Sequence, residues 1–132
     1  MSLSNVPKPV VLDTNAILLP FTQGIRIEEG LEDLLGAVSI HVPTSVLPEL
    51  QRLAENKGAL GRSARMALRL AERAVREPTG LMGDDGILEV ARRLQAVVVT
   101  NDKKLQQECL RSGLRVVVPR EFHLAFLNSG SG

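Results

Sequence analysis

Four short stretches of the chain are apolar and rich in β-branched residues. They lie at residues 9–13, 38–42, 96–100 and 115–119. Three of the four are nearly continuous apolar runs, which are typical of strands buried on both faces, as in a parallel sheet covered by helices. The pattern therefore predicts a buried, mainly parallel sheet.

Between these strands, apolar residues recur at helical spacing and helix-forming residues are frequent. The predicted helices span residues 43–56, 60–77, 84–94 and 103–112, and the predicted loops span residues 20–30 and 78–83. The second helix is expected to end before Pro78 and the last at Gly113. Strands that alternate with helices predict an α/β fold, a three-layer α/β/α sandwich. We expect one domain at residues 1–127 and a flexible tail at 128–132.

Composition narrows the functional classes only slightly. The 132 residues include 16 Lys and Arg against 15 Asp and Glu, a net charge of +1, so net charge argues neither for nor against nucleic acid. With three Phe and no Trp or Tyr, a platform for stacking the bases of single strands is poorly supplied. A lone cysteine, Cys109, fits a reducing cytoplasm, and no apolar stretch approaches the roughly 18 residues of a membrane span.

Acidic residues follow two of the predicted strands. Asp13 ends the first strand, and Asn101 and Asp102 follow the third. In an open parallel sheet, ligands bind beyond the carboxyl ends of the strands, so both acids are expected at that edge. Glu49, in the helix at 43–56, and the pair Asp84 and Asp85, which open the helix at 84–94, can join them.

Each acid also has an ordinary structural explanation. Asp13 can be a turn residue, Glu49 an exposed helix residue, and Asp84, Asp85 and Asp102 can stabilise helix N-termini. Several carboxylates at one strand edge, however, repel one another unless a cation neutralises them. Oxygen ligands without His or Cys favour Mg²⁺ or Mn²⁺, and such ions activate water and polarise phosphoryl oxygens. The acids together therefore predict phosphodiester hydrolysis.

Four segments resemble PIN-domain ribonucleases, in the order in which that family carries them. They are VVLDTNAIL at 10–18, VLPELQRL at 46–53, GDDGILEVA at 83–91 and VVVTNDKKL at 97–105. The pair of acids before an apolar helix resembles the ribosomal-RNA-processing branch of the family, and the toxin branch is also similar. The resemblance covers nearly the whole chain and implies the PIN fold and endoribonuclease activity.

The resemblance also implies a role for particular residues. It places Asp13, Glu49, Asp84 and Asp102 in the catalytic site, with Asp13, Asp84 and Asp102 as metal ligands. It implies polar support from Asn15, Thr100 and Asn101, with Asp85 as the alternative to Asp84. Such a site is expected to bind one or two Mg²⁺ or Mn²⁺ ions and to leave a 5′-phosphate and a 3′-hydroxyl.

Two groups of basic residues are candidates for holding RNA. One face of the helix at 60–77 is predicted to carry five arginines, namely Arg62, Arg65, Arg69, Arg73 and Arg76. That face can equally be a solvated surface, or contact an acidic partner or a second subunit. Lys103 and Lys104 begin a helix directly after Asp102. Positive charges at the start of a helix oppose its dipole, so the two lysines do not stabilise their own helix. This local cost favours a role in binding substrate phosphate.

Other functions compete with the nuclease. An aspartyl phosphatase would need a second Asp where Asn15 stands, and a phosphate-receiver domain would need a Lys where the late strand offers Arg120. A protein of this fold that binds RNA or acts as a scaffold, and cleaves poorly, is a further alternative. The resemblance implies RNA as substrate, an antitoxin or a ribosome-assembly factor as partner, and a homodimer.

Overall fold

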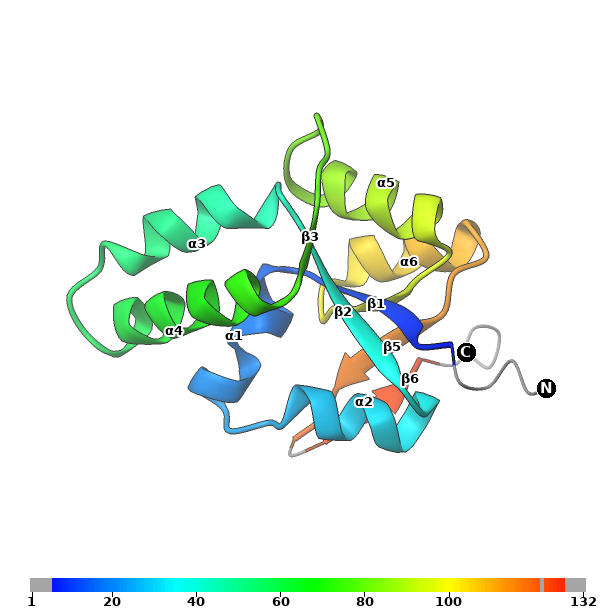
Figure 1. Cartoon of the computed structure of the whole chain (residues 1–132), viewed down its shortest axis with the longest axis horizontal. Coiled ribbons are helices and arrows are strands. Elements are labelled where there is room, and N and C mark those ends of the chain that lie inside the picture. Colours follow the sequence, from blue (N-terminus) through cyan, green and yellow to red (C-terminus); the bar gives the residue numbers. More distant parts are fainter. Residues whose placement is uncertain (1–5, 122, 128–132) are drawn as a thin grey trace.

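A six-stranded sheet forms the centre of the computed structural model, which describes residues 6–121 and 123–127 (Figure 1). Its strands are β1 (Lys8–Leu12), β2 (Val38–Pro43), β3 (Val75–Glu77), β4 (Val97–Val99), β5 (Val116–Pro119) and β6 (Leu124–Phe126). The order is β3-β2-β1-β4-β5-β6, and every neighbouring pair is parallel except β5 and β6. The predicted, mainly parallel sheet is confirmed, whereas the tail predicted at 128–132 lies outside the described residues.

Helices cover both faces of the sheet, as the sequence predicts. They are α1 (Thr14–Thr22), α2 (Ile27–Leu35), α3 (Val46–Ala54), α4 (Ala59–Arg73), α5 (Gly83–Leu94) and α6 (Lys103–Arg111). Helices α5 and α6 pack together on one face, while α1, α2 and α4 lie on the other, and α3 forms a hairpin with α4 (Figure 1). None of the helices among the described residues is long and apolar enough to span a membrane.

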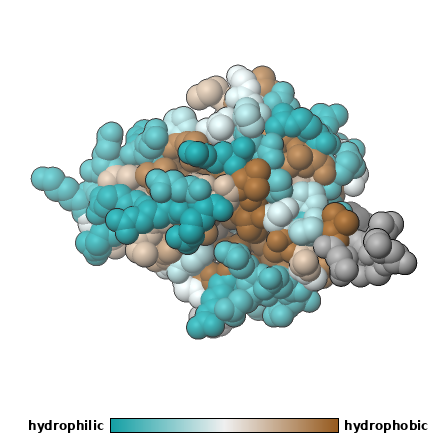
Figure 2. Space-filling view, viewed as in Figure 1, coloured by the Kyte–Doolittle hydropathy of each residue, from teal (hydrophilic) through white to brown (hydrophobic). Residues whose placement is uncertain are grey.

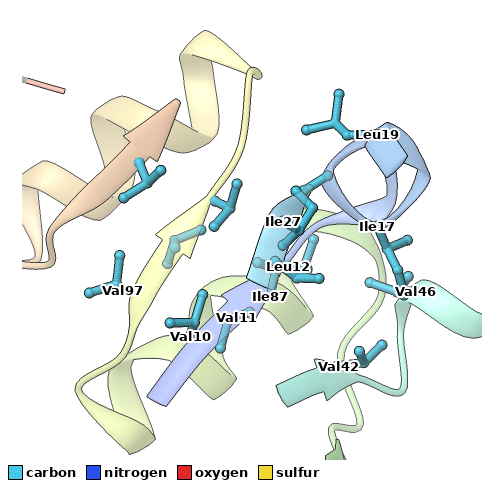
Figure 3. Close-up of a cluster of buried hydrophobic side chains, with 14 of the residues drawn as sticks. Val10, Val11, Leu12, Ile17, Leu19, Ile27, Val42, Val46, Ile87 and Val97 are labelled. Carbon is cyan, nitrogen blue, oxygen red and sulfur yellow. The ribbon is translucent and has the colours of Figure 1, made fainter. Parts of the chain in front are cut away.

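The core lies between the layers and is centred on the middle strands. Val11 of β1 pairs in register with His41 of β2 and Val98 of β4. The side chains of Val10, Val11 and Leu12 are fully buried, and they lie with those of Ile17 from α1 and Ile87 from α5 (Figure 3). Burial from both sides explains why the strand sequences are continuously apolar rather than alternating.

The loop predicted at 20–30 is largely wrong, because only residues 23–26 connect two helices that include the rest of it. Helix α1 includes Pro20 in its interior, where proline removes the hydrogen bond that its N–H would otherwise donate to the Ala16 carbonyl. Helix α2 includes Gly30, where a Cβ would come within 3.0 Å of the Leu124 side chain of β6. Pro and Gly favour a loop in the sequence, but here Gly30 allows a close contact with a strand almost a hundred residues away.

The helix predicted at 60–77 is also partly wrong. Helix α4 ends at Arg73, and Val75–Glu77 form β3, which pairs with β2 at the edge of the sheet. Arg76 therefore does not share the helical face of the other four arginines. The predicted helix at 43–56 likewise begins too early, because Pro43 still belongs to β2. Pairing between distant segments overrides the local helix preference in both places.

Candidate active site

Asp13 lies where β1 ends, at the point where the strand order reverses. From β1 the chain continues to β2 on one side, and β4 pairs on the other, so the carboxyl ends of β1 and β4 flank the crevice in which such sheets bind ligands. The Asp13 carboxylate is buried, with 5% of the residue exposed. Its Oδ1 accepts a hydrogen bond from the Ala16 N–H at 2.8 Å, and its Oδ2 accepts one from the Thr100 hydroxyl at 2.5 Å. Asp13 is therefore held in one orientation while it caps α1.

A cleft of about 130 Å³ brings the four predicted acids together, and we call it the acid cleft. It is lined by Asp13, Thr14, Asn15, Ser45, Val46, Glu49, Gly83, Asp84, Ile87 and Asp102. Its acids come from the end of β1, from α3, from α5 and from the segment after β4. Asp85 is exposed and does not line the cleft, so of the adjacent pair it is Asp84 that faces the other acids.

Two threonines hold the acids in place. Thr100, predicted as a polar neighbour of Asp102, hydrogen-bonds Asp13 and also accepts the Asp102 N–H at 3.0 Å. Thr14 donates its hydroxyl to Glu49 Oε1 at 2.7 Å, across 35 residues of sequence. Thr14 was not predicted from the sequence. Its one signal is its place directly after Asp13, which does not reveal the partner on α3.

Asp102 serves as a cap and also lines the acid cleft. Its Oδ1 accepts the Leu105 N–H at 3.0 Å, which stabilises the start of α6. The two explanations of this residue are thus compatible, because a carboxylate has lone pairs beyond those used in one hydrogen bond.

Ser45 is a second residue that the sequence analysis missed. Its Oγ is buried and has no hydrogen-bond partner among the described residues, although Ser45 lines the acid cleft. A Cβ at Gly86 would lie 2.7 Å from this oxygen, so glycine there makes room for it. A buried, unpaired hydroxyl costs free energy, which fits a site that places a polar group or a bound water against it.

Burial and the charges of neighbouring acids raise the pKa of two members of the acid cleft, Asp13 and Asp84. Burial raises the pKa of Asp13 to about 6, and the charges of Asp84 and Asp102 add to the rise. The hydrogen bonds from Thr100 and Ala16 lower this pKa, but by less than burial raises it. The pKa of Asp84 is also raised, first by burial and then by Asp102, Glu108 and Glu49, whereas Lys104 lowers it. A cation in the cleft would relieve this repulsion.

The donor set of the cleft fits a hard divalent cation. Carboxylates and a serine hydroxyl are oxygen ligands, and His and Cys are absent from the lining. As the side chains are arranged, no group of three or more His, Cys, Asp or Glu within residues 6–121 and 123–127 lies close enough to hold an ion. Glu49, Asp84 and Asp102 are exposed residues, and Glu49 and Asp102 each use one carboxylate oxygen in a hydrogen bond, with Thr14 and with the Leu105 N–H. Completing such a site therefore requires a shift of these side chains toward the buried Asp13.

The other predicted site residues lie around the acid cleft. Asn15 lines the acid cleft, and among the described residues its side chain makes no hydrogen bond to Asp13. Asn101 lines a neighbouring groove instead. Lys103 and Lys104 are exposed at the start of α6, and Lys104 is near enough to influence Asp84.

The arginines of α4 lie outside the acid cleft. The four are Arg62, Arg65, Arg69 and Arg73, and all of them are exposed. Figure 2 shows hydrophilic side chains gathered over the α3–α4 hairpin. Arg65 donates to the carbonyl of Ala54 at 2.7 Å, which ties α4 to the end of α3. Arg73 lines a separate pocket beside α2. Their predicted contact with RNA stays a prediction.

The raised pKa of Asp13 predicts a specific pH dependence in metal-free protein. In the folded protein the Asp13 carboxyl keeps its proton up to about pH 6, whereas in the unfolded chain it releases the proton near pH 3.8. Above pH 6 the buried carboxylate is ionised and lowers the free energy of unfolding. This free energy rises again as the pH falls from 6 toward 4, by at most about 1.4 kcal/mol per pH unit. Urea unfolding in EDTA should show this trend in wild type relative to Asp13→Asn. Parallel pH profiles for the two proteins would contradict it.

Comparisons with known proteins agree with this architecture. A family model described as a PIN-like domain matches residues 10–121. Ribonuclease VapC9 of Archaeoglobus fulgidus is 26% identical over 125 residues, covering 94% of this chain and 92% of the relative. Ribonuclease VapC4 of Methanocaldococcus jannaschii is 27% identical over 119 residues, covering 85% and 90%.

Solved structures show the same fold. The PIN domain endonuclease Utp24 superposes with a TM-score of 0.74 at 30% identity, covering 91% of both chains. A domain of a functionally unknown protein from Methanocaldococcus jannaschii gives a TM-score of 0.62 at 20% identity, a likeness that concerns the fold alone.

Proposed function

Since the chain belongs to the PIN-like domain family, we propose that it is a metal-dependent endoribonuclease that hydrolyses RNA phosphodiester bonds in the acid cleft. The observation that carries this proposal is the convergence of four carboxylates, from four separate segments, on one small cleft around the buried Asp13. The names of the similar proteins, two ribonucleases and an endonuclease, support the same reaction class.

Each residue of the cleft has a part in the proposed reaction. Asp13, Asp84 and Asp102 would hold Mg²⁺ or Mn²⁺, with Asp13 kept in place by Thr100. When bound, the ion supplies positive charge that polarises a phosphoryl oxygen and lowers the pKa of water. Glu49, oriented by Thr14, is placed to accept a proton from the attacking water. The family resemblance adds that cleavage leaves a 5′-phosphate and a 3′-hydroxyl.

Lys103 and Lys104 are proposed to attract the substrate. They stand at the start of α6, directly after Asp102, and Lys104 lies near enough to the cleft to lower the pKa of Asp84. An RNA phosphate approaching the acids needs nearby positive charge to offset repulsion, and these lysines supply it.

Two biological settings are consistent with the proposed activity. One is RNA processing, in which a ribosome-assembly factor would be the partner, and the other is a toxin ribonuclease paired with an antitoxin. The likeness to the endonuclease Utp24 and to the ribonucleases VapC9 and VapC4 accords with endonucleolytic cleavage in either setting. The homodimer rests on the family resemblance, and light scattering on the purified protein tests it.

The proposed reaction is tested with a panel of end-labelled RNAs incubated in EDTA, in Mg²⁺ and in Mn²⁺. We expect discrete internal cuts with either ion and intact RNA in EDTA, with activity restored when the ion is added back. A fold-competent protein that binds RNA but leaves every member of the panel intact would instead support the scaffold alternative.

Ser45→Ala separates a role in the reaction from a role in folding. Since the Ser45 hydroxyl has no partner among the described residues, its loss should change the free energy of unfolding by less than about 0.5 kcal/mol. The variant should cleave RNA about tenfold to a hundredfold more slowly, because the hydroxyl would no longer be available to hydrogen-bond a polar group or water bound in the cleft. Cleavage rates and urea unfolding measure the two effects.

Ser63→Ala is the matched control for this prediction. Ser63 on α4 donates its hydroxyl to the Phe21 carbonyl at 3.3 Å and is remote from the acid cleft. It should lose about 1 kcal/mol of stability and keep its cleavage rate. The prediction for Ser45 is wrong if both serine variants lose stability and activity in proportion.

A further inference from the structure

A buried glutamine lies on the side of α6 that faces the core. Gln106 is 7% exposed, and together with Leu105 and Cys109 it forms the buried side of this helix. Burying an amide costs free energy unless its polar atoms find hydrogen-bond partners. An apolar residue would pack there without this cost, so a glutamine at this position indicates a task beyond packing.

The side chain of Gln106 binds the turn that leads into the acid cleft. Its Nε2 donates to the Thr100 carbonyl at 3.0 Å, and both residues are buried. Strand β4 ends at Val99, so this carbonyl lies just beyond the strand, and a buried carbonyl without a partner is costly. The backbone N–H of Gln106 also donates to the Asp102 carbonyl at 2.9 Å. One residue of α6 therefore holds the turn at two points.

Thr100, the residue that Gln106 holds, contacts two of the proposed metal ligands. Its hydroxyl donates to Asp13 Oδ2 and accepts the Asp102 N–H at 3.0 Å. Its own N–H donates to the Val117 carbonyl of β5 at 3.2 Å. With the bond from Gln106, every polar group of Thr100 has a partner. The direction of the Thr100 hydroxyl follows from the backbone that carries it, and Gln106 fixes that backbone from the side of α6.

We propose that Gln106 is a positioning residue for the metal ligands of the acid cleft. By holding the Thr100 carbonyl, it fixes the hydroxyl that orients Asp13 and the turn that presents Asp102, and it thereby sets the affinity of the cleft for a divalent cation. This inference rests on the proposed function and extends it to a residue outside the lining of the cleft. Loss of a residue that hydrogen-bonds a metal ligand weakens ion binding about tenfold to a hundredfold. Gln106 acts one bond further out, so its effect is smaller.

The first measurement is Mn²⁺ binding to the RNA-free protein. Free Mn²⁺ gives an electron paramagnetic resonance signal that weakens on binding, so a titration yields the dissociation constant without any cleavage. Gln106→Met keeps the length of the side chain and lacks the N–H donor. Gln106→Asn keeps the amide and is one methylene too short to reach the Thr100 carbonyl, and it decides the question if the methionine variant does not fold.

Two variants of the same helix serve as controls. Gln107→Met makes the identical change at the adjacent, exposed position. Cys109→Ala removes a fully buried sulfur and leaves the bond between Gln106 and Thr100 in place, so it reports what a loss of core packing in α6 does by itself. Urea unfolding of each variant in EDTA gives the accompanying change in stability.

Both Gln106 variants should raise the Mn²⁺ dissociation constant about fivefold, and both controls should stay within about twofold of wild type. In the cleavage assay, the Mg²⁺ concentration that gives half the maximal rate should rise by the same factor. The rate at saturating Mg²⁺ should stay within about twofold of wild type, because the ligands themselves are unchanged. A purely structural role would instead lower stability in Gln106→Met and Cys109→Ala alike, without a change in ion affinity.

A double-mutant cycle with Thr100→Val tests whether Gln106 acts through Thr100. Valine matches the shape of threonine and lacks the hydroxyl, so Thr100→Val should weaken Mn²⁺ binding about tenfold. Adding Gln106→Met should then weaken binding by less than about twofold more, because the hydroxyl that the glutamine orients is already gone. Two independent residues would give about fiftyfold in the double variant.

Unchanged Mn²⁺ affinity in the Gln106 variants, or independent losses in the cycle, would overturn the proposal while leaving the nuclease intact. A wild-type protein that binds Mn²⁺ but cuts no RNA would instead overturn the proposed function, and the Mn²⁺ titrations would still decide the role of Gln106. A wild-type protein that binds no Mn²⁺ would overturn both.

Discussion

Asp13→Asn should slow RNA cleavage by about a thousandfold or more, which corresponds to about 4 kcal/mol of transition-state stabilisation. The substitution removes the one buried carboxylate of the acid cleft, which accepts hydrogen bonds from Ala16 and Thr100. Without its charge, the cleft loses the ligand around which the three exposed acids can gather. The initial rate of cleavage of a labelled RNA in Mg²⁺ measures the effect.

The fold should survive this substitution. Asparagine is as good an N-cap as aspartate, so its oxygen can still accept the Ala16 N–H, and the Thr100 hydroxyl can turn to accept from the new amide. Asp33→Asn, which changes an exposed aspartate on α2, is the control and should cleave at the wild-type rate. A folded Asp13→Asn protein that cleaves as fast as Asp33→Asn would remove Asp13 from the reaction.

Leu50→Ala should reduce the free energy of unfolding by about 3 kcal/mol. Leu50 is fully buried on the inner face of α3, and removing a buried leucine side chain costs about 2–5 kcal/mol because a cavity remains. Urea unfolding followed by circular dichroism measures the loss. Since Glu49 precedes Leu50 on the same helix, cleavage should also slow as the contact between Glu49 and Thr14 loosens.

Leu81→Ala provides the comparison for Leu50. Leu81 is 45% exposed and belongs to the loop before α5, so the same change in chemistry should cost less than about 0.5 kcal/mol. Equal losses in the two variants would show that α3 is not packed against the core as described.

The sequence predicted where Asp13 and Asp102 lie in the fold because their positions follow from local rules. A buried parallel strand ends at the ligand-binding edge of its sheet, so Asp13 and Asp102 could be placed there from hydrophobicity alone. The choice between Asp84 and Asp85 could not be made in this way, because successive helical residues point about 100° apart and the helix phase depends on tertiary packing. Thr14 and Ser45 were missed since their importance lies in contacts with distant segments.

The errors in the predicted fold have the same origin. Gly30 and Pro20 locally favour a loop, yet packing against other elements stabilises α1 and α2 around them. Val75–Glu77 continue a strongly helical segment, but pairing with β2 makes them a strand. In each case a partner far away in the sequence decides the structure, and no short window of residues contains that partner.

The acid cleft is tested most directly by comparing Asp84→Asn with Asp85→Asn in one cleavage assay with Mg²⁺, because the two aspartates are adjacent and only Asp84 lines the cleft. Each change removes one negative charge from the first turn of α5, so effects on the helix and on net charge are matched. The account predicts that Asp84→Asn lowers the cleavage rate by about a hundredfold or more, while Asp85→Asn stays within about threefold of wild type. Equal rates in the two variants, or a greater loss in Asp85→Asn, would contradict the assignment of the acid cleft as the active site.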